Sequence, residues 1–230
     1  LPAAGCPVLT LATATTAGPS PLPPIGTGDR SLAELAYERI LAAILDGGLV
    51  PGDRLIMDRL AAELGISRTP VRDALHRMQA DGLVQPATKG FVIRSLDAGD
   101  VRTMYKAREP VEGWGARGAA GRAAAAGPVI AEALAGLADV PVDEPSAAYR
   151  ANRDFHRAVV LGAGNPVLVD CFDTIWGRGL ALLSFAESAR HGSTVDLDEH
   201  RLLYEAVMSG DPERAEAEML AHIRRGADSV

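Results

Sequence analysis

Residues 60–75 read LAAELGISRTPVRDAL and contain two short helical segments joined by a tight turn. Apolar residues recur on one face of the first segment, and Gly65 marks its end. The second segment begins at Ser67 or Thr69, and Pro70 is tolerated in its first turn because the amide that proline lacks would have no helical acceptor there. Two short helices joined by a glycine-containing turn predict a helix-turn-helix.

The sequence on both sides of this motif predicts a preceding helix and a following hairpin. Apolar residues recur at helical spacing between positions 32 and 44. Residues 83–86 and 91–93 read as two short strands around a turn at 87–90. Three helices followed by a hairpin predict a winged helix-turn-helix over residues 29–95.

Basic side chains lie on the outward face of the last of these three helices. Arg68, Arg72 and His76 recur at helical spacing opposite the apolar positions. A planar guanidinium can donate two hydrogen bonds to one guanine, so arginines near a helix start favour base or phosphate contacts. On an arbitrary helix the same residues would more often form a solvated surface. The surrounding winged helix favours DNA binding.

The composition excludes several classes of protein. The chain has 230 residues, 47% of them apolar, and a mean hydropathy of +0.07, which excludes disorder along its whole length. It has no uninterrupted run of about 18 apolar residues, so no membrane partner is expected. Cys6 and Cys171 match no metal or redox spacing, which is typical of a reduced, cytoplasmic protein.

The formal net charge of −7 is confined to one part of the chain. Residues 29–94 contain nine Lys/Arg and nine Asp/Glu, whereas the residues from Ser95 onward contain 14 Lys/Arg and 21 Asp/Glu. Residues 1–28 carry no charge and include six prolines, so we expect a flexible leader there. The asymmetry indicates two further domains, at 29–95 and 96–230, with different partners.

The C-terminal residues contain no convincing strand and predict an all-helical bundle. Helical spacing gives six helices, at about 98–125 with a kink at Pro110, 128–138, 146–162, 165–187, 194–209 and 211–227. Trp114 and Trp176 are expected in the core or in a pocket lining. The chain is therefore expected to be mainly α, with an N-terminal winged helix-turn-helix and a C-terminal all-α bundle.

Three histidines lie on these predicted helices where each could act as a metal ligand: His156, His200 and His222. Asn152 precedes His156 by four residues, so the two share a helix face. Three imidazoles and one oxygen could hold a divalent transition metal and leave coordination positions open. Single histidines on helices are more often surface or core residues, so spacing alone leaves both interpretations open.

Four stretches of the N-terminal domain resemble the winged-helix module of GntR-type bacterial transcription regulators. They are VPGDRL at 50–55, the segment 60–75, DGLV at 81–84 and KGFV at 89–92. The resemblance implies binding as a homodimer to a short pseudo-palindromic operator in double-stranded DNA. In such a complex the last helix lies in the major groove and the hairpin lies near the minor groove. The implied DNA contacts come from Arg59, Ser67, Arg68, Thr69, Arg72, Lys89 and Gly90.

The C-terminal region resembles the effector-binding FCD domain of the same family, in its smaller size class. The resemblance is carried by YKAREPVE at 105–112, NRDFH at 152–156, GNPVL at 164–168, EHR at 199–201, GDPERA at 210–215 and MLAH at 219–222. It implies a divalent transition metal, zinc or nickel, with the ligands Asn152, His156, His200 and His222. It also implies that the metal and Arg108 together bind the carboxylate of a small organic acid.

Two residues of this implied site have alternative interpretations. Many members of the family have Asp where this chain has Asn152, and a neutral amide is a weaker ligand for a dication than a carboxylate. Arg108 could instead form a salt bridge with Glu109, Glu112 or another acid of the bundle.

Together these features predict a ligand-responsive bacterial transcription regulator. We expect a repressor that binds its operator as a dimer and is released when a small carboxylate binds at the metal site. One alternative is a metal-responsive regulator, in which the ion itself is the signal. A metal-dependent enzyme is a second alternative, because three histidines with an open coordination position also describe a catalytic zinc site. Against it, the sequence has neither a His-Glu-x-x-His motif nor a nucleophile elbow.

Overall fold

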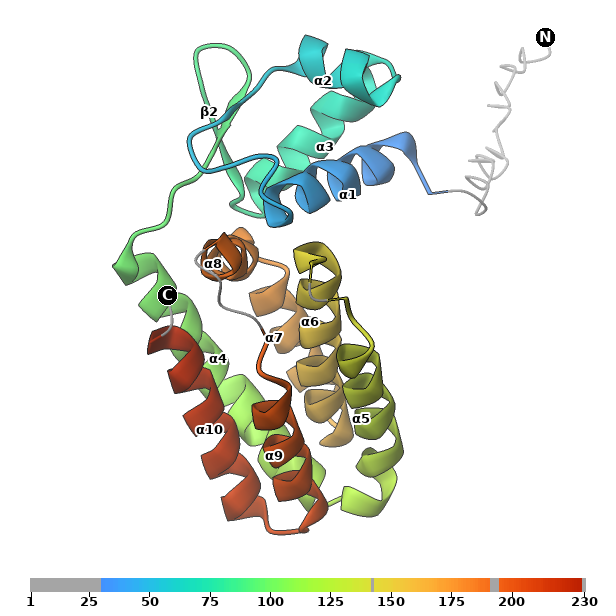
Figure 1. Cartoon of the computed structure of the whole chain (residues 1–230), viewed down its shortest axis with the longest axis vertical. Helices are drawn as coiled ribbons and strands as arrows, with labels where there is room; N and C mark the ends of the chain where they lie inside the picture. The colour runs from blue at the N-terminus through green and yellow to red at the C-terminus, as the bar shows by residue number, and fades with distance from the viewer. Residues whose placement is uncertain (1–29, 142, 191–194, 229–230) are drawn as a thin grey trace, which may run out of the picture. The chain divides into compact units, whose positions relative to one another are not determined.

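Three helices and a small sheet form the winged helix-turn-helix in this computed structural model (Figure 1). The structure describes residues 30–141, 143–190 and 195–228, and the leader expected at 1–28 lies outside them. The helices and strands are α1 (Leu32–Leu45), β1 (Arg54–Leu55), α2 (Met57–Leu64), α3 (Arg68–Ala80), β2 (Val84–Pro86) and β3 (Phe91–Ile93). The elements predicted from the sequence are thus confirmed, and β1 is an addition.

Local interactions at the helix ends explain where these helices start and stop. Ser31 and Glu34 form a capping box on α1: the Ser31 hydroxyl accepts from the Glu34 amide at 3.2 Å, and the Glu34 carboxylate accepts from the Ser31 amide at 2.9 Å. α2 ends at Gly65, whose φ of 67° lies in the left-handed region that favours glycine. α3 follows Ser67 and buries the apolar face that its spacing predicts. The buried residues of α3 are Val71, Ala74, Leu75 and Met78.

The wing hairpin β2–β3 is extended by β1 into an antiparallel sheet of order β1-β3-β2. Leu55 of β1 lies opposite Phe91 of β3. Gly90 enters β3 with a φ of 76°, and a Cβ at this position would collide with the Leu55 carbonyl group. Glycine is therefore needed at position 90 for β1 to pair with the wing. β1 was not predicted because two residues are too few to show a periodicity.

Seven helices follow within the described residues, one more than the sequence predicts. They are α4 (Ala98–Ala120), α5 (Ala123–Ala138), α6 (Pro145–Gly162), α7 (Pro166–Trp176), α8 (Gly179–Arg190), α9 (Leu197–Met208) and α10 (Pro212–Asp228). α4 ends at Ala120 rather than at 125, and α5 starts at Ala123 rather than at 128. Within the described ranges, no helix has both the length and the apolar character needed to cross a membrane.

The single helix expected over residues 165–187 is wrong, because α7 and α8 are separated at Gly177 and Arg178. The amide of Gly179 leaves the helical pattern and donates to the carbonyl oxygen of Asp81 at 2.6 Å. Apolar spacing continues through the break, so the predicted helix runs across it although Gly177 and Gly179 are helix-ending signals. The hydrogen bond that accompanies the break joins residues almost a hundred positions apart, and local sequence does not encode it.

The same hydrogen bond joins the end of α3 to the start of α8 within the compact unit of residues 31–230. A Cβ at Gly179 would lie 2.6 Å from the amide nitrogen of Leu83, so only glycine fits there. The side chain of Asp81 also accepts a hydrogen bond from the Tyr37 hydroxyl of α1 at 2.7 Å. Asp81 therefore fixes the C-terminal end of α3 from two sides.

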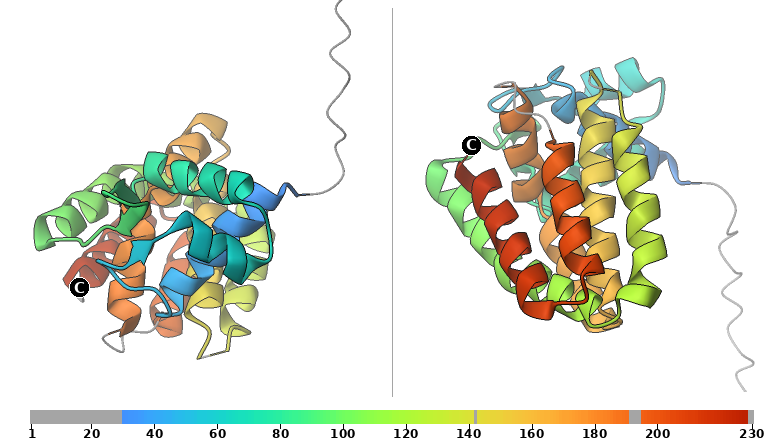
Figure 2. Two further views of the ribbon diagram at one scale, coloured as in Figure 1. Left: turned by 90° about the horizontal axis from the view of Figure 1, so that it is seen from above. Right: turned by 60° about the horizontal axis from the view of Figure 1, so that its bottom comes forward.

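Small residues let α4 approach α6 closely in the bundle. A Cβ at Gly115 would lie 2.8 Å from Val160 Cγ2, and one at Gly118 would lie 2.7 Å from Ala163 Cβ. α4 also lies beside α10, as both Figure 1 and Figure 2 show. α4 thereby contributes to one apolar core together with α5, α6, α9 and α10.

We expect Gly90→Ala to lower the free energy of unfolding by about 1–3 kcal/mol, because alanine is strained at positive φ. The absence of room beside the Leu55 carbonyl adds to this loss. Urea denaturation measures the effect. In the control Gly136→Ala, the added Cβ meets no atom within 4 Å inside α5, and stability should rise by about 0.5–1 kcal/mol. Equal unfolding midpoints for Gly90→Ala and the wild type would contradict the role given to this glycine.

Candidate metal centre and nucleic-acid interface

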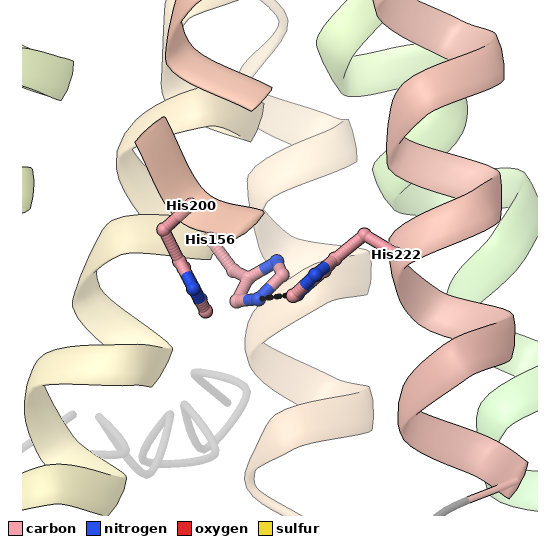
Figure 3. Close-up of side chains that lie close together, drawn as sticks. All are labelled: His156, His200 and His222. Carbon is pink, nitrogen blue, oxygen red and sulfur yellow. Dashed lines mark hydrogen bonds between the residues drawn. The ribbon is translucent and has the colours of Figure 1, made fainter. Parts of the chain in front are cut away.

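Three histidines from three helices converge in the bundle, as Figure 3 shows. His156 comes from α6, His200 from α9 and His222 from α10, and their nearest nitrogen atoms all lie within 4.8 Å of one another. Asn152 lies one turn before His156, and its Oδ1 is 2.8 Å from His200 Nε2. The structure therefore brings together all four residues implied as ligands.

The Nδ1 atom of each imidazole lies against an oxygen that can only accept a proton. His200 Nδ1 is 2.6 Å from the Asp196 carbonyl oxygen, and His222 Nδ1 is 2.8 Å from Glu199 Oε2. His156 Nδ1 is 2.7 Å from Glu112 Oε2. The contacts of His200 and His222 favour the tautomer with the proton on Nδ1, which leaves Nε2 with a free lone pair. His156 Nδ1 lies close to Glu112 without hydrogen-bond geometry, and this short approach to a carboxylate favours the same tautomer. Metal-binding histidines are held by this kind of outer partner.

The Nε2 atoms consequently face other acceptors. His222 Nε2 lies 3.3 Å from His156 Nε2, and His200 Nε2 faces Asn152 Oδ1. A half-turn of the Asn152 amide would supply one donor, but the contact between the two imidazoles would still join two lone pairs. A cation bound among these four atoms removes the conflict, so the donor set fits a divalent metal.

Burial favours the neutral form of the three imidazoles, which carries one N–H. Desolvation lowers the pKa of His200 to about 3, and the neighbouring His156 adds to the effect. Desolvation also lowers the pKa of His222 well below its usual value, with His156 and His200 contributing. The pKa of His156 is lowered by burial despite the nearby Glu112 carboxylate. Neutral imidazole is the form that binds metals, so the site is ready for an ion without losing protons first.

Arg108 is buried and forms an ion pair with Glu112, one of the alternatives that the sequence leaves open. Its Nε donates to Oε1 at 2.7 Å, and its Nη2 donates to Oε2 at 3.2 Å. Trp176 Nε1 donates to the same carboxylate at 2.9 Å. Burial alone would raise the pKa of Glu112, but Arg108 and His156 outweigh it and hold that pKa far below its usual value. Trp176 is buried as expected, whereas Trp114 is 59% exposed, so the expectation for Trp114 is wrong.

A cavity of about 290 Å³ opens beside the histidines. Asn152, His200 and His222 line it, so part of the metal site faces the cavity, while Arg108 is not part of the lining. The remaining polar lining includes Tyr105 of α4, Ser188 of α8, Asp196 and Glu199 at α9, and Arg225 of α10. The cavity is thus small, lined mainly by polar side chains, and formed by five helices: α4, α6, α8, α9 and α10.

Sequence reasoning missed three charged residues of this site. Glu112 was named only as a possible partner of Arg108 and Glu199 only as part of a motif, because their contacts to the imidazoles depend on the packing of separate helices. Arg225 was not singled out, although it follows His222 by three residues and so shares its helix face. That spacing was the available signal.

The residues expected to contact DNA lie on the surface of the winged helix, apart from the half-buried Gly90. The exposed residues are Arg59, Ser67, Arg68, Thr69, Arg72 and Lys89. Arg68 Nε is 2.9 Å from Asp58, and Arg59 Nε is 2.7 Å from Glu63, both in exposed ion pairs. Such pairs contribute little stability, so phosphate groups can replace the carboxylates at little cost. His76 instead packs its ring edge-on against Phe91 of the wing.

A winged helix-turn-helix followed by a helical bundle is typical of a class of bacterial transcription regulators. Residues 103–225 match the family model of the FCD domain, and residues 32–90 match that of the bacterial regulatory proteins of the gntR family. The chain therefore belongs to the GntR family of transcription regulators, in the branch with an FCD domain. Members of this family bind DNA and usually function as dimers, and they are regulators rather than enzymes.

Individual relatives agree with this assignment. The uncharacterized HTH-type transcriptional regulator YdhC of Bacillus subtilis (strain 168) is 28% identical over 202 residues, which cover 84% of this chain and 88% of YdhC. A probable D-xylose utilization operon transcriptional repressor of Paenarthrobacter nicotinovorans is 27% identical, with coverage of 84% and 86%. Among solved structures, E. coli McbR/YncC is 25% identical with a TM-score of 0.64, covering 86% of this chain and 95% of that one.

We expect Asn152→Asp to strengthen metal binding by about tenfold or more, because a carboxylate adds a charge–charge attraction to a dication that the neutral amide lacks. Part of this attraction offsets the desolvation of the carboxylate. Competition with a metal chelator measures the dissociation constant. Asn165→Asp is the matched control, since Asn165 caps α7 and is not one of the four converging residues. A weaker metal affinity in Asn152→Asp would show that Asn152 is not a ligand.

Proposed function

We propose that this chain is a repressor that binds a pseudo-palindromic operator as a homodimer and is released when a small carboxylate binds at a divalent metal in the C-terminal domain. The observation that carries the proposal is the convergence of three imidazole nitrogens and one amide oxygen: His222 Nε2 lies 3.3 Å from His156 Nε2, and His200 Nε2 lies 2.8 Å from Asn152 Oδ1. A buried cluster made only of acceptors is costly unless a cation lies among them.

Nε2 of His156, His200 and His222 and Oδ1 of Asn152 would hold the ion. A set of imidazoles with one oxygen suits zinc or nickel, and an ion that takes five or six ligands would keep a position for a further ligand beside these four. When bound, the ion supplies a positive centre that attracts a carboxylate oxygen. FCD domains often bind metals, which supports the proposal.

Charged side chains around the histidine cluster orient the imidazoles. Glu112 and Glu199 hold the Nδ1 sides of His156 and His222, which fixes both rings. Arg108 lies behind the ligands, and in this proposal its positive charge assists the binding of the carboxylate. Because Glu112 already occupies two of its donors, Arg108 acts mainly through its charge.

Residues 29–95 form the DNA-binding domain in this proposal, and residues 96–230 form the sensing domain. Arg59, Arg68 and Arg72 bind bases or phosphates. Ser67, Thr69, Lys89 and Gly90 contact the DNA backbone and the minor groove. A regulator that acts on operator DNA works in the bacterial cytoplasm. The relative named as a probable repressor supports repression as the mode of action.

We expect His200→Ala to remove the bound metal and the response to small acids while operator binding persists, because the winged helix does not contain this residue. Elemental analysis after dialysis and a gel shift with and without candidate acids measure both properties. His76→Ala removes a histidine outside the cluster and should retain the metal. If His200→Ala keeps one metal per chain, the ligand assignment is wrong. If chelation of the wild type changes operator affinity with no acid present, the ion itself is the signal.

We expect Arg72→Ala to weaken specific operator binding by about 1–3 kcal/mol, or roughly 5- to 150-fold, because one guanidinium contact to a base is lost. Gel shifts at several salt concentrations measure this and show how many phosphate contacts remain. Arg201→Ala removes an equally exposed arginine from α9 and should leave operator affinity unchanged. Unchanged affinity in Arg72→Ala would disprove its assigned role.

A further inference from the structure

We infer that the ion pair of Glu199 and Arg225 determines which acid the cavity accepts, and that it selects a monocarboxylic acid carrying several hydroxyl groups over a dicarboxylic or an alkyl acid of the same length. The inference rests on the proposed function, because it assumes that one carboxylate of the ligand binds at the histidine cluster. It concerns the opposite end of the ligand.

Arg225 lies within reach of a ligand held at the histidines. It follows His222 by three residues on α10, so the two side chains are neighbours on one helix face, about 5–6 Å apart at their Cβ atoms. Among the described residues that line the cavity, Arg225 is the only arginine or lysine. Its side chain is 45% exposed, whereas that of Arg108 is 7% exposed. A short acid bound at the metal site therefore extends toward Arg225.

The charge of Arg225 is already compensated. Its Nε donates to Glu199 Oε1 at 2.5 Å, and its Nη2 donates to Glu218 Oε1 at 3.0 Å. Asp196 adds a further carboxylate to the lining. A second carboxylate on the ligand would enter a region where acids outnumber the one guanidinium, and like charges repel strongly in a small cavity. A dicarboxylic acid is thus disfavoured.

A ligand hydroxyl group can form hydrogen bonds with both partners of such an ion pair. The guanidinium has five N–H donors, and the two recorded contacts engage Nε and Nη2. An alcohol oxygen can accept from another N–H of Arg225 and donate its own proton to Glu199. The hydroxyls of Tyr105 and Ser188 add further groups that both donate and accept. An alkyl chain would offer no partner to the remaining N–H groups of Arg225 or to the hydroxyls of Tyr105 and Ser188 after water is displaced, which is unfavourable.

Glu199 contacts both the histidine end and the arginine end of the cavity. Its Oε2 accepts from His222 Nδ1 while its Oε1 accepts from Arg225. The group that orients a metal ligand therefore also positions the guanidinium. Glu199 thereby sets the distance between the imidazole of His222 and the guanidinium of Arg225. A ligand that reaches from one to the other must match this distance, so the cavity is sensitive to ligand length.

The test is calorimetric titration of the metal-loaded full chain with acids of equal carbon number. The four-carbon set contains threonate and its stereoisomer erythronate, succinate and butyrate. The six-carbon set contains the stereoisomeric hexonates, adipate and hexanoate. We expect at least one polyhydroxy acid to bind about tenfold or more tightly than both of its matched acids, since sites built for hydroxyls reject ligands that lack them.

The variant Arg225→Met should lower the affinity for that polyhydroxy acid about tenfold while leaving metal content and the affinity for the alkyl acid unchanged. Arg224→Met is the matched control: Arg224 pairs with Glu109 outside the cavity lining and should alter neither affinity. Tighter binding of a dicarboxylate, or full polyhydroxy-acid affinity in Arg225→Met, would overturn the inference and leave the proposed function intact. Binding of none of these acids to metal-loaded protein would overturn both.

Discussion

The packing of the C-terminal domain depends on the interactions of one buried carboxylate, that of Glu112. It lies within α4, yet it accepts hydrogen bonds from Arg108 of the same helix and from Trp176 of α7, and it contacts His156 of α6. A buried charge with fewer partners would be strongly unfavourable, so an arrangement of these three helices that broke these contacts would be penalised. The position of the first metal-ligand candidate follows from this one group.

The helix-turn-helix could be predicted from sequence because its determinants are local. Gly65 and Ser67 act within a few residues of their own positions, and the apolar spacing of α3 is visible in a single window. The four converging residues were implied by a family resemblance, whereas spacing alone could not distinguish them from core histidines. The outer partners of the imidazoles could not be foreseen, because Glu112 and Glu199 reach His156 and His222 only through the packing of separate helices.

The winged helix and the helical bundle arrange their ion pairs in opposite ways. The arginines of the winged helix form exposed ion pairs that a phosphate can replace, whereas Arg108 and Glu112 form a buried pair closed to solvent. Exposed pairs are screened by salt and exchange partners readily, and buried pairs do not. The first arrangement suits a surface that must bind and release a polyanion. The second suits a scaffold that must keep imidazoles in place.

Gly179 limits how freely the two domains can be exchanged between related regulators. Its amide binds Asp81 of the winged helix, and any larger residue would collide with Leu83. Trp176, which touches the Glu112 carboxylate, lies only three residues earlier. In a chimera joined at the short segment before α4, the DNA-binding module would therefore lose the hydrogen bond between Asp81 and the start of α8. Grafting this module onto another sensor requires the turn between α7 and α8 to be carried with it.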